Sequence, residues 1–241
     1  KLLKVIFYIF GKIVHIIIFF AITKFKIIKI MIPIEEFYAD PRIVENLNAC
    51  INCGVCTALC PAADYYDYEP RYVERVVLSH DPVALEELMS SDYIWYCGQC
   101  MSCKARCPRE NAPGVVISAL RYWSQKTGLF AKSKMGRNQV IIKQTIGQNI
   151  YDFGYCVHPS KVTHEAHPEQ GPVWEWVFHN QKKAYSLVNA NIDQEGAGPV
   201  RKITDKTMEE IHSILKGTGA IDFWDHIEKT VADYDNNNKN K

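Results

Sequence analysis

Two runs of cysteines with the same spacing constrain this chain more than any other feature of its 241 residues. Each run reads C-x2-C-x2-C-x3-C-P, and residues 61–96 separate them. The repeated spacing indicates two bound groups of the same kind rather than eight independent thiols. The cysteines are Cys50, Cys53, Cys56 and Cys60 in the first run and Cys97, Cys100, Cys103 and Cys107 in the second.

This spacing is the bacterial iron–sulfur ligand pattern, in which the fourth cysteine of each run binds the other cluster. Three thiolates come from one tight loop, and we expect Gly54 and Gly98 to let the backbone turn closely around the sulfurs. The proline directs the fourth cysteine away from its own loop. We therefore predict two crosswise-ligated [4Fe–4S] clusters. The first site comprises Cys50, Cys53, Cys56 and Cys107, and the second site comprises Cys97, Cys100, Cys103 and Cys60.

Two other uses of the cysteines explain the pattern less well. Structural zinc typically takes two ligands from each C-x2-C pair, which leaves the third and fourth cysteine of each run without a role. A disulfide framework needs an oxidising compartment and gives no reason for two identical spacings. The ninth cysteine is Cys156, and His158, His164 and His167 follow it at spacings that match no zinc pattern. We interpret Cys156 as a spare thiol in a surface loop.

The first 30 residues differ in composition from the rest of the chain. They contain six lysines and no acid, whereas the remainder has 22 basic and 27 acidic residues. Three interpretations compete: a translated upstream stretch of A/T-rich DNA before Met31, a membrane helix over 5–23, and a cleaved secretory signal. Lys12 near the middle disfavours a membrane span. We expect a cytoplasmic protein, with membrane contact only if this segment belongs to the working protein.

Beyond Met31 the pattern of apolar residues and helix-start signals predicts a mainly helical chain. Asp40-Pro41 and Asp81-Pro82 each place a capping side chain before a proline at the first helical position. We divide the chain into a basic apolar segment (1–30), a helical ferredoxin domain (31–130) and a helical, loop-rich C-terminal extension (131–241). Helices are expected after 41, over 70–79, after 82, over 113–128, 131–150, 205–216 and 222–234, with loops and short helices over 151–200 and a frayed tail.

The segments around the cysteines resemble a known family. CINCGVCTALCPAADYYDYEPRYVERVVL and YIWYCGQCMSCKARCPRENAPGVVISALRYWSQKTG are similar to the iron–sulfur subunit of heterodisulfide reductases, over about residues 45–130. The later stretch GYCVHPSKVTHEAHPEQGPVWEWV resembles the iron–sulfur subunit of the heterodisulfide reductase-like complex of sulfur-oxidising prokaryotes. The resemblance implies an all-helical ferredoxin fold and an electron-transfer subunit.

The same resemblance implies partners. In that family, the iron–sulfur subunit relays electrons between a flavin-bearing subunit and a catalytic subunit with cysteine-rich domains. The complex is thought to oxidise sulfur carried on a lipoate-binding protein. This chain has neither the cysteine-rich motif of the catalytic partner nor a dinucleotide glycine fingerprint. We therefore expect an electron relay without a catalytic site of its own.

Several other side chains are candidates for a role at the clusters. Trp95 either shields a cluster from water or packs in the core, while Trp174 and Trp176 pack or face a partner. Nothing ionisable lies between Cys50 and Cys60, but the second run carries three cations, Lys104, Arg106 and Arg109. Positive charge favours the reduced cluster, so this hypothesis gives the second site the higher potential.

Two alternative functions stay open at this stage. One is a membrane-anchored iron–sulfur protein that exchanges electrons with quinone, which requires residues 1–30. The other is a zinc-stabilised interaction protein. Binding to nucleic acid through bulk charge is excluded, because the formal net charge is only +1.

Overall fold

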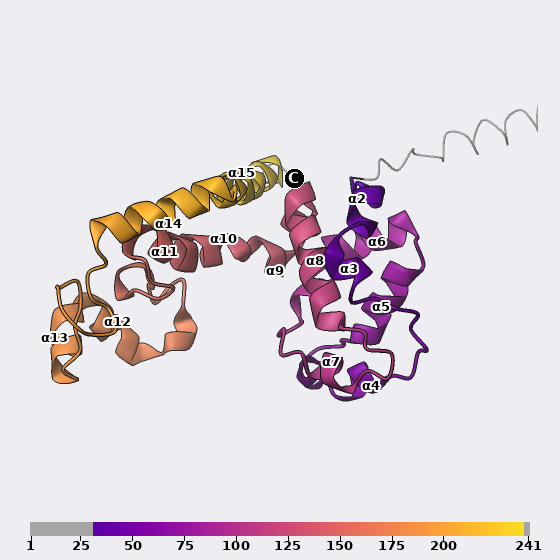
Figure 1. Cartoon of the computed structure of the whole chain (residues 1–241), viewed down its shortest axis with the longest axis horizontal. Helices are drawn as coiled ribbons and strands as arrows, with labels where there is room; N and C mark the ends of the chain where they lie inside the picture. The colour runs from indigo at the N-terminus through magenta and orange to yellow at the C-terminus, as the bar shows by residue number, and fades with distance from the viewer. Residues whose placement is uncertain (1–30, 239–241) are drawn as a thin grey trace, which may run out of the picture.

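The computed structural model describes residues 31–238 and shows an all-helical chain (Figure 1). The interpretations of residues 1–30, including a membrane anchor and quinone exchange, fall on a segment outside the described residues. Within the described part, no helix is both long and apolar enough to cross a bilayer. The only β-type pairing there is a single bridge between Ile192 and Val200. The mainly helical fold class is confirmed.

Short helices and loops alternate in the half of the chain that contains the cysteine runs. Several begin where the sequence predicts. The Asp40 side chain caps a helix at Pro41, Asp81 caps one at Pro82, and the helix over 113–127 ends at Gly128 in a left-handed conformation. The elements are α2 (Ile34–Tyr38), α3 (Pro41–Val44), α4 (Val55–Ala58), η1 (Pro61–Asp64), α5 (Pro70–Leu78), α6 (Pro82–Ser90), η2 (Tyr93–Trp95), α7 (Ser102–Arg106), α8 (Pro113–Thr127) and η3 (Leu129–Lys132).

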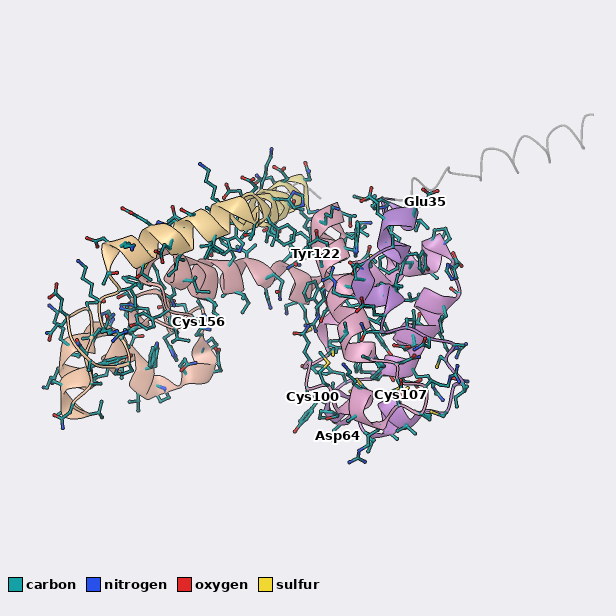
Figure 2. The ribbon with its side chains drawn as sticks, in the orientation of Figure 1. Glu35, Asp64, Cys100, Cys107, Tyr122 and Cys156 are labelled. Carbon is teal, nitrogen blue, oxygen red and sulfur yellow. The ribbon has the colours of Figure 1, made fainter. Side chains whose placement is uncertain are left out.

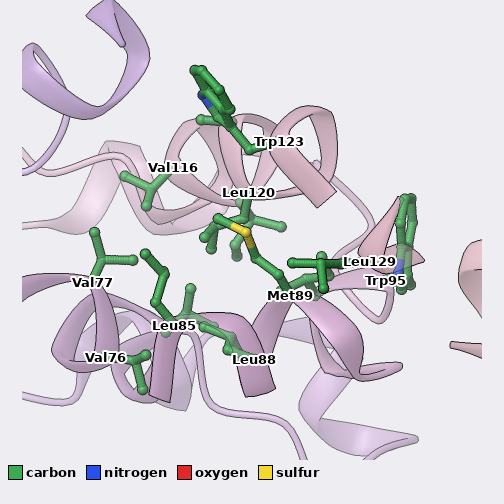
Figure 3. Packing of buried hydrophobic residues seen from close by; sticks show 14 of the residues in the cluster. Val76, Val77, Leu85, Leu88, Met89, Trp95, Val116, Leu120, Trp123 and Leu129 are labelled. Carbon is green, nitrogen blue, oxygen red and sulfur yellow. The ribbon is translucent and has the colours of Figure 1, made fainter. Parts of the chain in front are cut away.

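One hydrophobic core joins α5, α6 and α8 and supports the cysteine loops from one side. Figure 3 shows Val77, Leu85 and Met89 facing Val116 and Leu120 across the space between these helices. Burial of such side chains provides the main driving force that holds the helices together. The linker between the two cysteine runs therefore supplies much of the packing, as its predicted helical character requires.

The chain beyond residue 130 is helical but irregular. The single helix predicted over 131–150 begins three residues later and consists of α9 (Lys134–Arg137), α10 (Gln139–Ile142), a π-helical turn η4 (Lys143–Gly147) and α11 (Gln148–Phe153). Loops follow with the short helices η5 (Pro159–Lys161), η6 (Pro168–Gln170), α12 (Pro172–His179) and α13 (Gln181–Leu187). The region over 151–200 is loop-rich, as predicted.

Two long helices, α14 (Asp205–Gly217) and α15 (Ala220–Asn238), complete the described chain. The tail was expected to fray from residue 235, and this is wrong for residues 235–238, because α15 continues through Asn238. Asn238 donates a side-chain hydrogen bond to the Tyr234 carbonyl within this last turn.

Helix α15 returns to the half of the molecule that contains the cysteines (Figure 1). Ile227 is 4% exposed and belongs to the same core as α5, α6 and α8, with Phe223 and Val231 packed against it. The Phe223 ring stacks on Tyr122 of α8 at 5.7 Å, and His226 hydrogen-bonds to the Gln125 carbonyl at 3.0 Å. The core thus crosses the predicted domain boundary at residue 130, which itself falls within η3; that boundary stays a prediction.

Candidate iron–sulfur site

The two cysteine loops have the same backbone conformation. In the first loop Asn52 (φ 59°) and Gly54 (φ 80°) are left-handed, and in the second loop Gln99 (φ 53°) and Met101 (φ 60°) occupy the equivalent positions. Left-handed residues turn the chain sharply, so that successive cysteine side chains face the same side. The repeated sequence spacing therefore corresponds to a repeated loop structure.

The expectation about Gly98 is wrong, whereas the expectation about Gly54 is confirmed. Gly98 is not left-handed, and an added Cβ would meet no atom within 4 Å. Its counterpart in the first loop is Ile51, a residue with a full side chain. The sharp turn of the second loop lies instead at Gln99 and Met101, for which the left-handed conformation carries a steric cost.

Backbone amides in both loops point at the first sulfur of each run. Asn52 N donates to Cys50 Sγ at 3.4 Å, and Gln99 N donates to Cys97 Sγ at 3.4 Å. Cys100 Sγ also lies 3.4 Å from the Ser102 hydroxyl oxygen. Donors to sulfur stabilise the negative charge of a thiolate, and hydrogen bonds to the sulfurs are a determinant of iron–sulfur potentials.

The first cavity is bordered by the cysteines of the predicted first site and by no other cysteine. Cys50, Cys53 and Cys56 surround it together with Cys107 from the far end of the second run. The cavity has a volume of about 380 Å³, counted out to its open mouth. A residue 57 positions from Cys50 in the sequence thus shares a cavity with it, which is the crosswise arrangement that the pattern predicts.

The second cavity, of about 370 Å³, is bordered by Cys97, Cys100 and Cys103 together with Cys60 from the first run. Cys56 also reaches its edge, so this residue borders both cavities. The short helices that follow the loops, α4 and α7, pack against each other. Figure 2 shows Cys100 and Cys107 at this end of the molecule, distant from Cys156.

The donor set fits iron–sulfur clusters. Each cavity is lined by the four thiols of one predicted site, the ligand number of a [4Fe–4S] cluster, and the sulfurs border a hollow rather than converge on one point. Among residues 31–238, no three Cys, His, Asp or Glu side chains meet closely enough to hold a single metal ion. The ligand role of the eight cysteines stays a prediction.

A buried carboxyl beside the first cavity is the main feature that sequence reasoning missed. Glu74 is 1% exposed, lines the cavity, and accepts a hydrogen bond from Asn111 Nδ2 at 3.1 Å, while its second oxygen has no partner within the described residues. Burial raises the pKa of the Glu74 carboxyl to about 8, and the Asn111 hydrogen bond opposes this shift only in part. Burial, followed by the proximity of Glu74, also raises the pKa of the Cys56 thiol to about 11.

The cations of the second run do not all lie at the second site. Arg109 lines the first cavity, together with Arg71, which pairs with Glu69 at 3.1 Å. Lys104 and Arg106 are exposed in the last turn of α7, where solvent screens their charge. The assignment of all three cations to the second site is therefore wrong for Arg109, because the crosswise chain path takes residue 109 past the first cavity.

The remaining candidates occupy packing positions. Trp95 is buried in the core, and the Arg121 guanidinium lies over its ring at 5.2 Å. Trp174 donates to the Val162 carbonyl at 2.7 Å, whereas Trp176 is exposed. Cys156 lies on the surface, as expected.

The histidines near Cys156 do not surround it. His158 is fully buried, stacks on Phe153 at 3.8 Å and contacts Asp193 Oδ1 at 3.1 Å. His167 contacts Glu169 Oε1 at 2.8 Å. These contacts give two of the three histidines structural partners.

Comparison with known proteins agrees with this geometry. Residues 46–111 match the family of 4Fe-4S dicluster domains, a segment that contains all eight cysteines of the two runs. Curated relatives include a subunit of the ferredoxin:CoB-CoM heterodisulfide reductase of Methanosarcina acetivorans, which is 45% identical over 84 residues. That match covers 35% of this chain and 32% of the relative.

Two further relatives extend the comparison. A CoB–CoM heterodisulfide reductase iron-sulfur subunit of Methanocaldococcus jannaschii is 25% identical over 174 residues, which is 72% of this chain and 75% of the relative. A heterodisulfide reductase subunit-like protein of Archaeoglobus profundus is 30% identical over 79 residues, which is 32% of this chain and 40% of the relative. The chain thus spans about a third of the Methanosarcina relative and three quarters of the Methanocaldococcus one. All three names denote the same subunit class, so the predicted resemblance to the iron–sulfur subunit of heterodisulfide reductases is confirmed.

Proposed function

We propose that this chain is an electron-transfer subunit that holds two [4Fe–4S] clusters and serves a heterodisulfide reductase-like complex. The observation that supports this most directly is the pair of cavities, each bordered by three cysteines of one run and the last cysteine of the other. The dicluster family match over the same residues supports the cofactor type. When bound, each cluster would supply a site that accepts and returns one electron.

The residues of the chain have distinct tasks in this proposal. The eight cysteine thiolates hold the clusters, and the amides of Asn52 and Gln99 stabilise negative charge on Cys50 and Cys97. The core of α5, α6 and α8 keeps the two loops at a fixed separation and excludes water from one side of both cavities. Electron transfer requires only this fixed geometry, so no side chain has to take part in bond chemistry.

The partners follow from the relatives, whose names describe subunits of heterodisulfide reductases. We propose that the ferredoxin domain, residues 31–130, exchanges electrons with the flavin-bearing subunit and the cysteine-rich catalytic subunit of such a complex. The extension, residues 131–238 of the described chain, completes the core through α15 and is available to contact these partners. A lipoate-bound sulfur substrate is the finer proposal, and the resemblance of residues 154–177 to the subunits of sulfur oxidisers supports it.

Iron and acid-labile sulfide in anaerobically purified protein test the cofactor. We expect about eight iron and eight sulfide per chain, because each cubane contains four of each. Two zinc and no sulfide would show instead a zinc-stabilised protein. Cys156→Ser is the matched control, since it removes a thiol outside both cavities and should leave the iron content unchanged.

A set of combined variants tests crosswise ligation. Replacing Cys50, Cys53 and Cys56 together by serine should leave about four iron at the second site. In that background, adding Cys107→Ser should change nothing further, whereas adding Cys60→Ser should remove the remaining iron. The reverse result would show that each run binds its own cluster. The iron that remains in the background variant also reports that the chain still folds.

A further inference from the structure

A buried tyrosine behind the second cavity has a hydroxyl group without a partner. Tyr68 is 2% exposed, and no protein atom in the described part of the chain accepts or donates a hydrogen bond at its oxygen. Buried tyrosine hydroxyls usually find a partner, because an unpaired buried polar group costs free energy. An orphaned hydroxyl at this place indicates an acceptor that the protein atoms alone do not supply.

The groups around this hydroxyl are the sulfurs of the second site. Burial raises the pKa of Tyr68 well above its usual range, and the next causes are the nearby Cys97 and Cys60, with Cys97 acting more strongly. Tyr68 is not among the residues that line the cavity. It therefore lies behind these cysteines, on the core side, where water does not compete for the hydrogen bond.

Neighbouring aromatic rings fix the orientation of the Tyr68 ring. Its centroid is 5.0 Å from that of Tyr93 and 6.2 Å from that of Tyr96, with an edge-on arrangement to the latter. The Tyr93 hydroxyl is already used, since it accepts a hydrogen bond from Glu69 N at 2.6 Å. The packing thus leaves the Tyr68 hydroxyl free to interact only toward the cysteines.

A buried cation reinforces the same side of the site. Arg121 on α8 donates from Nη2 to the Cys97 carbonyl at 2.6 Å and from Nε to the Ile94 carbonyl at 2.9 Å. These bonds hold the backbone of Cys97 in place relative to α8 and leave a fixed positive charge beside it. Reduction of a cluster adds negative charge, part of which resides on the sulfurs, so donors and cations here favour the reduced form.

We propose that the Tyr68 hydroxyl donates a hydrogen bond to the Cys97 sulfur in the loaded protein and thereby raises the reduction potential of the second-site cluster. Tyr68 is a positioning residue in this scheme: it contacts a ligand and takes no part in electron transfer itself. The inference rests on the proposed function, because it requires a cluster at the second site. It agrees in direction with the sequence argument for a higher potential there, but assigns the effect to a buried donor instead of to exposed cations.

The test is Tyr68→Phe, which removes one oxygen and keeps the ring. It is made in the full chain and in the background that lacks Cys50, Cys53 and Cys56, where only the second-site cluster contributes to the EPR signal. Loss of one hydrogen bond should lower the equilibrium constant for reduction about three- to tenfold, and tenfold corresponds to about 59 mV for one electron. In the full chain one potential should move and the other should stay.

The matched control is Tyr38→Phe. The Tyr38 hydroxyl donates to the Val77 carbonyl at 2.7 Å, so this variant also removes a hydrogen bond from the same core, but not one to a cysteine. Both potentials should be unchanged in it. A shift of equal size in the control would mean that general repacking causes the effect, and would overturn the proposal.

A spectroscopic readout separates the hydrogen bond from packing. After exchange into D2O, pulsed EPR of the reduced second-site cluster should show a coupled exchangeable deuteron that disappears in Tyr68→Phe. An unchanged potential, or a coupling that persists in the variant, would overturn the inference. Iron and sulfide are measured first: their absence from the unmodified chain would refute the proposed function itself, whereas normal content with no shift would refute only the role of Tyr68.

Discussion

Asp40 connects the start of the described chain to α8 through one carboxylate. Its Oδ1 accepts from Arg42 N at 2.9 Å and so caps α3, and its Oδ2 accepts from Trp123 Nε1 at 2.8 Å. Arg42 Nη2 also contacts Oδ2 at 2.6 Å. Asp40 is 8% exposed, and its hydrogen bonds with Arg42 lie nearer to solvent than the Trp123 bond, which is the most deeply buried of the set.

We expect Asp40→Ala to lower the free energy of unfolding by about 2–4 kcal/mol. Loss of the cap contributes about 1 kcal/mol, and the indole N–H of Trp123, left unpaired in the core, contributes about 1–3 kcal/mol. Asp40→Asn should cost less, about 1–2 kcal/mol, because asparagine caps equally well and still offers an oxygen to Trp123. Only the charge opposite the half-exposed Arg42 is lost.

The pH dependence of this contribution has a definite sign. The Arg42 hydrogen bond is the largest cause that lowers the pKa of Asp40, to about 2, with Trp123 adding to it. A carboxyl whose folded pKa lies below its unfolded value of about 3.9 stabilises the protein above that value and loses its effect as pH falls. The difference between the unmodified chain and Asp40→Asn should therefore be constant from about pH 5 to 8 and shrink between about pH 4 and 2.

Anaerobic urea unfolding followed by far-UV circular dichroism measures these changes. With a slope of about 2 kcal/mol per molar urea, Asp40→Ala should move the midpoint by about 1–2 M. A double-mutant cycle with Trp123→Phe isolates the buried hydrogen bond, since the two changes should be strongly non-additive. A loss below about 0.5 kcal/mol in Asp40→Ala, or full additivity, would refute the reasoning from the buried indole.

Two further predictions concern positions with matched controls. Gly54→Ala should weaken retention of the first-site cluster under chelator challenge, because φ is +80° and the new Cβ would lie 3.3 Å from Arg71 Nη1, whereas Gly98→Ala should be neutral; equal iron loss in both would contradict the loop geometry. Ile227→Ala should lower the stability of the cysteine-containing lobe by about 2–4 kcal/mol, read as a fall in the thermal midpoint. Ile214→Ala on α14, a residue 63% exposed, is its control, and an equal effect of the two would argue against α15 as part of the core.

Local chemistry accounts for what the sequence allowed us to predict. Each of the helix starts at Pro41 and Pro82 depends on a capping aspartate directly before the proline, so the whole signal lies within two adjacent residues. The crosswise grouping of the cysteines was predictable because the spacing itself repeats. The left-handed conformation of Met101 was not, since nothing in its side chain favours that conformation over glycine at position 98.

Long-range packing explains most of the remainder. Burial of Glu74 depends on Asn111, which is 37 residues away. One signal was present: Glu74 lies four residues after Pro70 and three before Val77, so a carboxylate interrupts an otherwise apolar stripe of α5. The return of α15 onto α8 depends on the length and path of the whole extension, which no local pattern specifies.

The position of Ile227 in the core has a consequence for the order of events during protein synthesis. When a ribosome has made residues up to 130, all eight cysteines of the two runs exist, but the helix that closes their core has not yet been made. Domains tend to fold as units once their last packing element emerges. The lobe therefore reaches its final packing only after α15 leaves the ribosome, and iron delivered to the nascent chain before that point meets an open structure.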